Sequence, residues 1–365
     1  MADETLARTL GHLERLVAFD TRNPPRAIDG GGIFSYLQAE LSGHGLTCTL
    51  VDLGEGCVYL LATRGAPKLL INAHVDTVPA DPGWTTDPLR LVVDDERAVG
   101  LGACDIKGAV ACLLAVLGET QGPVALLFSS DEEAGSSRCV RHFIEQFAFT
   151  EVLVAEPTSC KAVLEHRGIG AATLFFTGIG GHASAARALR DSAVHEAVRW
   201  ASRALDHAAA SEEEGEGALK GMRLNLGAIE GGVKANMIAS AASIRLGVRP
   251  PPELPPPVAL ERLLAQAQDQ SRVRLAPGFS APPLPACGAA ALSAARVAAA
   301  ELAARLGLPV GPPVDFWTEA ALFSAAGSTA LVFGPGDIAQ AHTAGEYVRL
   351  AELVAAAAYY RRVLS

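Results

Sequence analysis

The segment GPVALLFSSDEEAGS (residues 122–136) joins an apolar run, typical of a buried strand, directly to three consecutive carboxylates, Asp131, Glu132 and Glu133. Carboxylates this close repel one another and lose hydration on burial, so an inward-facing group of them needs a compensating charge. A multivalent cation would supply that charge, whereas a solvent-exposed turn would need none. This strand end therefore predicts either a metal site or a surface turn.

The segments around this strand alternate between buried strands and amphipathic helices. Residues 68–76 (KLLINAHVD) are also apolar and strand-like, whereas residues 3–19, 31–45 and 107–120 carry apolar side chains at helical spacing. This alternation predicts an α/β fold with a mostly parallel sheet covered by helices on both faces. In such sheets functional groups gather just beyond the carboxyl ends of the strands.

A smaller α+β unit is predicted as an insertion in this fold, over residues 166–281. Its Ala-rich segment 190–210 has helical character, and residues 222–232 and 241–250 resemble strands. A helix-then-strand pattern returns after it, so residues 1–165 and 282–365 together form the predicted metal-binding catalytic domain. The segment RPPPELPPPV (249–258) is interpreted as a proline-stiffened connection.

Composition narrows the classes of function. The chain has 365 residues, a formal net charge of −10 and 19% charged residues, which indicates a soluble globular protein of two domains. We expect no nucleic-acid partner, because no long basic stretch is present. We also expect no membrane partner and no secretion signal, and the seven cysteines without a C-x-x-C pair favour a reducing cytoplasm.

His74 and Asp76, at the end of the strand-like segment, are the first candidate for metal chemistry. Alternate residues of a strand point to the same face, so the carboxylate can hold one ring nitrogen while the other binds a metal. Alone, an H-x-D pair is a weak signal, because two polar residues at a strand end are common.

Further carboxylate and imidazole groups follow other apolar strands or precede helices. Asp105 lies in GLGACDIKG (100–108), Glu156 in LVAEPTS (153–159) and His342 in AQAHTAGE (339–346). Each alone could be a helix cap or a solvated loop residue. Together with Glu132 and Glu133 they form a set of imidazoles and carboxylates without thiolates, which suits a pair of zinc-like divalent cations.

The ordered motifs H-x-D, D-x-K-G, D-E-E-x-G, E-P-T and H resemble the zinc-dependent family of acetylornithine deacetylases, succinyl-diaminopimelate desuccinylases, aminoacylases and carboxypeptidases, from about Leu6 to the carboxyl terminus. The resemblance implies that Glu132 is the general base and that Asp76 orients a ligand. It implies two divalent metals, zinc or cobalt, with five protein ligands: His74 and Glu156 on one metal, Glu133 and His342 on the other, and Asp105 bridging them.

The same resemblance makes the inserted unit a lid and dimerisation domain of a homodimer. It implies that His182, in GIGGHASAA (178–186), assists catalysis at the neighbouring subunit's site, and that Asn236 and Arg249 contact substrate. The alternatives are a partly buried histidine in a glycine-rich turn and an arginine that caps a strand at the surface. Cys104, beside Asp105, is interpreted as a packing residue because no partner base is evident.

The segments DFWTEAALFSAAG (315–327) and FGPGDIAQAHTAGEYV (333–348) resemble the acetylornithine deacetylase branch, and with GGVKANMIAS (231–240) they resemble its acetylcitrulline-hydrolysing members most closely. The expected substrate is a small N-acyl amino acid, N-acetyl-L-citrulline, in arginine biosynthesis. N-acetyl-L-ornithine, or the substrate of a related aminoacylase or dipeptidase, is the alternative. Glu319 could face a cationic substrate but occurs in both branches, so it does not decide. A two-lobed binding protein and a metal-stabilised structural protein remain as non-enzymatic alternatives.

Overall fold

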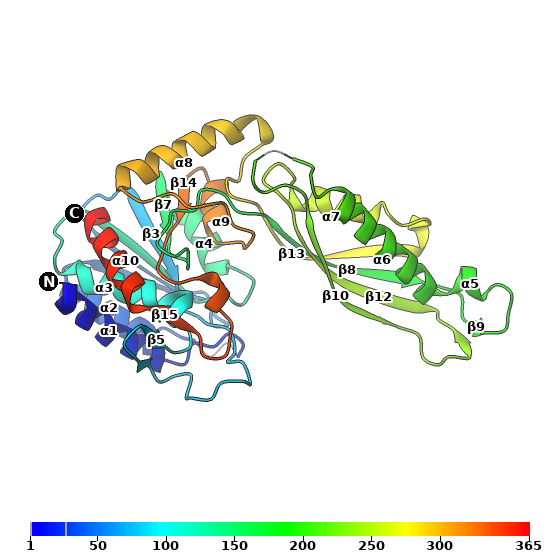
Figure 1. Ribbon diagram of the computed structural model, residues 1–365, viewed down its shortest axis with the longest axis horizontal. Coiled ribbons are helices and arrows are strands. Elements are labelled where there is room, and N and C mark those ends of the chain that lie inside the picture. The colour runs from blue at the N-terminus through cyan, green and yellow to red at the C-terminus, as the bar shows by residue number, and fades with distance from the viewer. Residues whose placement is uncertain (1, 26–27, 216) are drawn as a thin grey trace. The chain divides into compact units, whose positions relative to one another are not determined.

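The computed structural model describes residues 2–25, 28–215 and 217–365 and divides into two compact units (Figure 1). The first unit comprises Met1–Leu164, Ser293–Pro312 and Thr318–Ser365, and the second comprises Glu165–Leu292 and Pro313–Trp317. The second unit therefore extends past residue 281, where its predicted end lies. Its segment Pro313–Trp317 is held by two hydrogen bonds: the backbone N–H of Val314 donates to Glu165 O, and Trp317 Nε1 donates to Pro282 O at 3.0 Å.

The first unit is built on a six-stranded sheet in the order β1-β2-β6-β3-β7-β14. Four neighbouring strands, β6, β3, β7 and β14, are parallel, and β1 and β2 are antiparallel additions at one edge. The strand bounds are β1 Thr47–Asp52, β2 Val58–Arg64, β3 Leu69–His74, β6 Val124–Ser129, β7 Glu151–Val154 and β14 Thr329–Val332. The residues that follow the four parallel strands consequently leave the sheet at one common edge.

Helices cover both faces of this sheet, as predicted. Every residue of α3 (Gly108–Leu117) is buried, which explains its entirely apolar sequence, and α1 (Ala2–Ala18) and α10 (Leu350–Val363) pack against it. Leu60 of β2 belongs to that core, whereas its neighbour Tyr59 points to the other face and meets Phe143 of α4 at a ring distance of 5.9 Å. The remaining helices of the unit are α2 Gly32–Gly43, α4 Arg138–Gln146, α8 Leu292–Leu306 and α9 Ala320–Ala325.

A small three-stranded sheet, in the order β15-β5-β4, accompanies the first unit. Its strands are β4 Val92–Val93, β5 Arg97–Val99 and β15 Tyr347–Arg349, with Tyr347 opposite Val99. It joins the segment before α3 to the segment before α10.

Single 3-10 turns occur at Gln270–Arg272, Ala289–Ala291 and Ile338–Gln340.

The second unit is a four-stranded antiparallel sheet with two helices on one face. Its strands, in the spatial order β10-β12-β8-β13, are Arg223–Gly231, Ala241–Arg249, Ile169–Thr177 and Val273–Ala281. Trp200 of α6 (Ala193–Ala210) is fully buried against the sheet, and α7 (Pro256–Leu264) packs beside it (Figure 1). The remaining elements are α5 Ala188–Asp191 and a two-stranded ladder of β9 Gly181–His182 with β11 Met237–Ile238.

The α/β class, the mostly parallel sheet and the inserted α+β unit agree with the sequence prediction. The segment 249–258 differs, because α7 begins inside it at Pro256. Proline is tolerated in the first turn of a helix, where its missing N–H would have no partner in any case. Among the described residues, no helix combines the length and the apolar character needed to cross a bilayer.

Candidate metal centre

Strand register brings the first candidate ligands to one edge of the large sheet. His74, the last residue of β3, lies opposite Ser129, the last residue of β6, and Asn72 of β3 lies opposite Val154, the last residue of β7. The acidic segment after β6 and Glu156 after β7 therefore emerge beside His74. The imidazole of His74 is 2% exposed, so any group that binds it is shielded from bulk water.

Asp105 lies between two imidazoles that are far apart in sequence. Its Oδ1 is 3.0 Å from Nε2 of His74, and its Oδ2 is 3.4 Å from Nε2 of His342. Asp105 precedes the buried helix α3, and its own backbone is not helical (φ −123°, ψ 89°). One carboxylate that faces two imidazoles with different oxygens has the arrangement expected of a bridge between two cations.

Glu133 and Glu156 complete the cluster on its two sides. Oε1 of Glu133 lies 2.8 Å from Nε2 of His342, and Oε1 of Glu156 lies 3.8 Å from Nε2 of His74. One ligand atom from each of His74, Asp105 and Glu133 falls within 4.8 Å of the others. The five residues predicted as metal ligands thus converge in one place.

The backbone of His342 has a left-handed conformation, with φ of 60°. Non-glycine residues seldom adopt this conformation, and those that do are often found at functional sites. The ring of His342 is half exposed, in contrast to the buried ring of His74, so this end of the cluster is open to solvent.

The charges of the cluster oppose one another. Burial raises the pKa of Glu156 and of Glu133, and the neighbouring Asp105 carboxylate raises both further. Burial alone would also raise the pKa of Asp105, but hydrogen bonds from His342 and His74 hold it below its usual range. Hydrogen bonds to Asp105 and Glu133 raise the pKa of His342 to about 10.

This donor set fits divalent cations. Three carboxylates, Asp105, Glu133 and Glu156, share a largely buried space with two imidazoles, and no thiolate takes part. Carboxylate and imidazole ligands suit zinc and similar ions, and a cation would offset the mutual repulsion of the carboxylates. The acidic segment is therefore better explained as part of a metal site than as a solvent-exposed turn.

Asp76 connects several parts of the cluster. Its Oδ1 is 3.4 Å from Nδ1 of His74, while its Oδ2 accepts hydrogen bonds from Asn23 Nδ2 at 3.2 Å and from the backbone N–H of Glu133 at 3.0 Å. The carbonyl oxygen of Asp76 lies closer to His74 Nδ1, at 3.0 Å. Asp76 thus lies beside His74 and holds Glu133, and the orientation of His74 by the carboxylate of Asp76 stays a prediction.

The other two acids of the triplet behave differently from Glu133. Glu132 is half-buried; burial raises its pKa, the positive charge of His74 lowers it, and the negative charge of Glu133 raises it further. Asp131 is fully buried and accepts hydrogen bonds from the backbone N–H groups of Arg138 and Cys139, as expected of a residue that organises a turn. The role of Glu132 as general base stays a prediction.

His182, Asn236 and Arg249 all belong to the second unit, whereas the cluster belongs to the first. His182 and Asn236 are exposed and adjacent: His182 is part of the ladder β9–β11, and Asn236 O accepts the backbone N–H of Ala183 at 3.1 Å. Arg249 is the last residue of β12, opposite Arg223. Their predicted roles toward substrate stay predictions.

Three buried polar residues in the first unit were not predicted as parts of the site. Asn23 bonds to Asp76, Glu346 accepts backbone N–H groups around Asp105, and Lys107 is fully buried beside that loop. The sequence carries some signal for two of them: Lys107 is the lysine of the D-x-K-G motif, and Glu346 follows His342 by four residues. Glu319 is only 1% exposed, and its Oε2 accepts a hydrogen bond from Ser129 Oγ at 3.4 Å.

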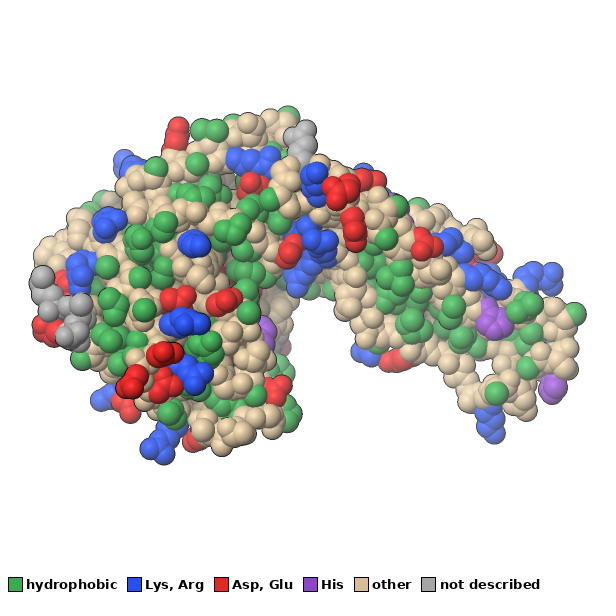
Figure 2. Space-filling view, viewed as in Figure 1, with side chains coloured by type: hydrophobic (Ala, Val, Ile, Leu, Met, Phe, Trp, Pro, Cys, Tyr) green, Lys and Arg blue, Asp and Glu red, His purple; other side chains and the backbone are tan. Residues whose placement is uncertain are grey.

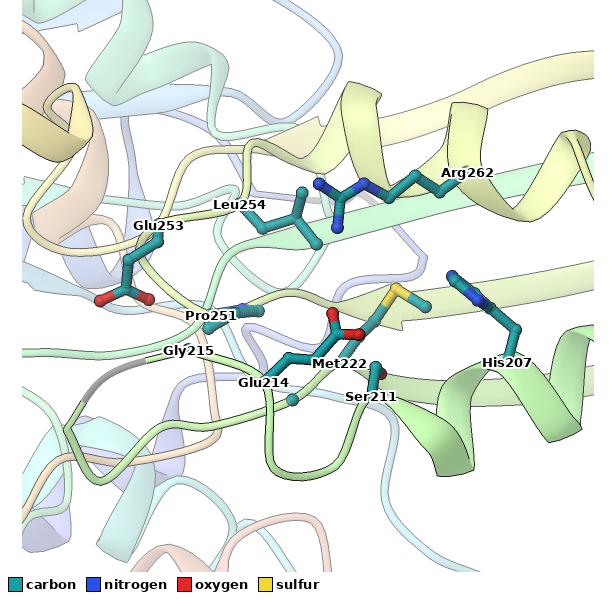
Figure 3. A pocket seen from close by; sticks show the side chains of 10 residues that line it. His207, Ser211, Glu214, Gly215, Met222, Pro251, Glu253, Leu254 and Arg262 are labelled. Atoms are coloured by element: carbon teal, nitrogen blue, oxygen red, sulfur yellow. The ribbon is translucent and has the colours of Figure 1, made fainter.

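A small cavity of about 150 Å³ lies in the second unit, between the end of α6 and the segment before α7 (Figure 3). His207, Glu214, Glu253 and Arg262 are among the residues that line it. None of the predicted site residues does, and all the lining residues belong to the second unit.

Three known proteins are similar to this chain over almost its whole length. N-acetyl-L-citrulline deacetylase of Xanthomonas campestris pv. campestris is 49% identical over 352 residues, which cover 96% of this chain and 95% of that protein. Acetylornithine deacetylase of Myxococcus xanthus is 32% identical and covers 99% of this chain and 98% of its own. The crystal structure of aminopeptidase PepT from Bacillus cereus shares the fold, with a TM-score of 0.76 at 17% identity over 98% of each chain.

The family model described as peptidase family M20/M25/M40 matches residues 70–365, which begin at β3 and include every predicted metal ligand. The chain belongs to peptidase family M20/M25/M40.

Proposed function

We propose that this enzyme hydrolyses the acetyl amide of N-acetyl-L-citrulline to give L-citrulline and acetate, with two divalent metal ions. The proposed reaction class rests on one observation. One ligand atom from each of His74, Asp105 and Glu133 lies within 4.8 Å of the others. The choice of substrate is supported by 49% identity to an N-acetyl-L-citrulline deacetylase.

Zinc is the metal we propose first, with cobalt as the alternative. His74 and Glu156 would hold one ion, Glu133 and His342 the other, and Asp105 would bridge them. When bound, the ions would polarise the amide carbonyl and lower the pKa of water in the site. The donor set of imidazoles and carboxylates supports this choice.

Glu132 moves the proton in the proposed reaction. It accepts a proton from the attacking water, whose oxygen forms a bond to the acetyl carbon, and delivers a proton to the amide nitrogen as the C–N bond breaks. Its neighbour Glu133 turns toward His342, with 2.8 Å between Oε1 and Nε2, which leaves Glu132 available for this work. Asp76 keeps Glu133 in place through Oδ2 of its carboxylate, and its backbone carbonyl bonds to Nδ1 of His74.

Residues of the second unit complete the proposal. We assign His182 to stabilisation of the developing oxyanion and Arg249 to the substrate's α-carboxylate, which a guanidinium can bind through two parallel hydrogen bonds. Asn236, next to the β9–β11 ladder that carries His182, is assigned to substrate contact.

We propose that the enzyme is a homodimer that associates through the second unit. Val198 and Leu205, seven residues apart on one face of α6, are 55% and 49% exposed, and Ile229 on the edge strand β10 is 52% exposed. Figure 2 shows hydrophobic side chains among charged ones on the surface of this unit. An apolar helix face beside a sheet edge suits association with a second copy.

We place the reaction in arginine biosynthesis in the cytoplasm. Cys104, Cys112 and Cys139 are buried thiols, as expected in a reducing compartment. The mixed acidic and basic side chains visible on the first unit in Figure 2 give no support to a nucleic-acid partner.

Initial rates on purified N-acetyl-L-citrulline and N-acetyl-L-ornithine, with zinc or cobalt supplied and with a chelated control, test the proposal. We expect hydrolysis of both compounds to require metal and acetylcitrulline to be preferred. Acetylornithine is the substrate in the name of the 32% identical relative. If it is preferred, the proposed substrate changes and the proposed reaction class stays. Full activity after complete chelation would overturn the metal-dependent mechanism.

A further inference from the structure

The carboxylate of Glu346 accepts three hydrogen bonds from the backbone around Asp105. Oε2 accepts the N–H of Gly102, and Oε1 accepts the N–H groups of Cys104 and Asp105, each at 2.9 Å. Glu346 is only 1% exposed, so these bonds take the place of water around its carboxylate. Hydrogen bonds from N–H groups to a buried carboxylate are stronger than those between neutral groups.

The loop that Glu346 holds has little freedom to find another path. Gly102 has a φ of 78°, and a Cβ atom there would lie 2.7 Å from Cγ2 of Thr77 and 3.0 Å from Cδ of Lys107. Only glycine suits such a position. The loop therefore wraps closely around the carboxylate and ends at Asp105, whose two oxygens face His74 and His342.

The other end of Glu346 is anchored as well. Its carbonyl oxygen accepts the N–H of Gly100 at 3.0 Å, which extends the β15–β5 ladder by one step. Its N–H donates to Thr343 O at 3.2 Å and closes the turn that begins after His342. Glu346 thus connects the segment that carries His342 to the loop that carries Asp105.

A buried cation, Lys107, lies close to Glu346. Lys107 is fully buried, its Nζ donates to the carbonyl of Phe19 at 3.1 Å, and Glu346 and Asp76 are among the negative groups that act on it electrostatically. The anchor is therefore part of a buried charged network rather than a surface cap.

We propose that Glu346 is a positioning residue that holds Asp105 between His74 and His342 and so sets the affinity and geometry of the metal site. This role rests on the metal-dependent function proposed above. It acts through the backbone of residues 102–105 and involves no contact between Glu346 and substrate.

The variant Glu346→Gln tests this role, because it keeps the shape of the side chain, removes the charge and turns one acceptor into a donor that faces an N–H group. Glu346→Asp is the second variant, since it keeps the charge and withdraws the carboxylate by one methylene. Glu196→Gln is the matched control: Glu196 is 5% exposed and pairs with Arg203 at 3.5 Å in the second unit.

Three measurements need no substrate. They are the zinc affinity of chelator-stripped protein by competition with a chromophoric chelator, the visible spectrum of the cobalt-loaded protein, and amide hydrogen exchange at Gly102, Cys104 and Asp105 in the metal-free protein. We expect Glu346→Gln to weaken zinc binding by about 10- to 100-fold, to change the cobalt spectrum and to speed exchange at those three amides. Glu346→Asp should fall between it and the unmodified protein, and Glu196→Gln should change none of the three.

Zinc affinity within twofold of the unmodified protein, with an unchanged cobalt spectrum, would overturn the role of Glu346 and leave the proposed function standing. Should Glu346→Gln fail to fold, the same comparison with Glu346→Asp decides. An unmodified protein that binds no zinc or cobalt would overturn the metal-dependent function, and with it this role.

Discussion

Oδ2 of Asp76 accepts the backbone N–H of Glu133 at 3.0 Å, across 57 residues of sequence. The other oxygen of Asp76 is 3.4 Å from His74 Nδ1. Asp76 therefore contacts a candidate ligand of each proposed metal ion: its carboxylate holds the N–H of Glu133, and its backbone carbonyl bonds to Nδ1 of His74 at 3.0 Å. A change at Asp76 should consequently affect both ions, whereas a partner of His74 alone would affect one.

Asp76→Asn should lower the affinity for both zinc ions by about 10- to 100-fold, because the amide presents a donor to either His74 or the Glu133 N–H. Stepwise zinc titration of the stripped protein measures the two affinities separately. Asp52→Asn is the control, since Asp52 is exposed and accepts the N–H of Gly54 at 2.8 Å. Weakened binding of only the ion assigned to His74 and Glu156 would show that the Asp76–Glu133 bond is unimportant.

Glu132→Gln should leave metal binding intact and lower kcat by about 10²- to 10⁴-fold, as expected for loss of general-base catalysis. Zinc content and initial rates on N-acetyl-L-citrulline, measured on the same preparation, check this. Glu55→Gln is a suitable control because Glu55 is exposed and forms an ion pair with the surface residue Arg138, at 2.8 Å. Unchanged turnover in Glu132→Gln would remove this residue from the mechanism.

Much of this site could be predicted because its parts are marked by local sequence. Apolar runs identify β3, β6 and β7, and a polar residue directly after a buried strand is conspicuous, as with His74 and the acidic triplet. The rule that such residues meet at one sheet edge then brings them together without coordinates. The ordered motifs added the individual ligand roles through family resemblance.

The positioning residues could not be predicted, because their partners are backbone groups brought close only by folding. Glu346 reaches the N–H of Asp105 across 241 residues, and Asn23 reaches Asp76 across 53. The edge strand β13 was also missed: Pro277 and Gly278 interrupt its apolar pattern, and its pairing with β8 is irregular at that point. Non-local pairing overrides local propensity there.

Zinc should stabilise the folded protein, because the ligand cluster that binds it is assembled only in the folded chain. At a free zinc concentration about 1,000 times the Kd of each site, the free energy of unfolding should increase by about 4 kcal/mol for each ion bound. Denaturant unfolding with and without zinc measures this change. In His74→Ala the gain should be much smaller, and an equal gain in that variant would place zinc binding elsewhere.

The pair His12 and Tyr36 should make stability depend on pH away from the metal centre. Nδ1 of His12 lies 2.6 Å from the Tyr36 hydroxyl, and burial lowers the pKa of His12 below its usual value of 6.5. The unfolded chain therefore binds the proton more readily, so this contribution is fully present above pH 6.5 and is lost as the pH falls toward the folded pKa.

Unfolding free energies at pH 7.5 and pH 5.5, in chelator, should therefore differ less in His12→Gln than in the unmodified protein. The difference between the two proteins isolates His12 from the other titrating groups. His207→Gln, at a half-buried position on α6, serves as the control. An identical pH dependence in His12→Gln would show that this histidine does not contribute.

Charged substitutions on the apolar face of α6 should separate the proposed dimer. The double variant Val198→Glu/Leu205→Glu places two carboxylates on a face whose native side chains are 55% and 49% exposed, so the isolated subunit should keep its fold. Association should weaken, because the interface loses apolar burial and gains charge repulsion. Sedimentation velocity measures the state, and we expect a shift from dimer to monomer. Val297→Glu, at a 55% exposed position on α8 of the first unit, should stay dimeric. The family resemblance implies that His182 acts at the neighbouring subunit's site, so kcat should fall along with the dimer fraction. Monomers that retain full activity would show that each subunit works alone.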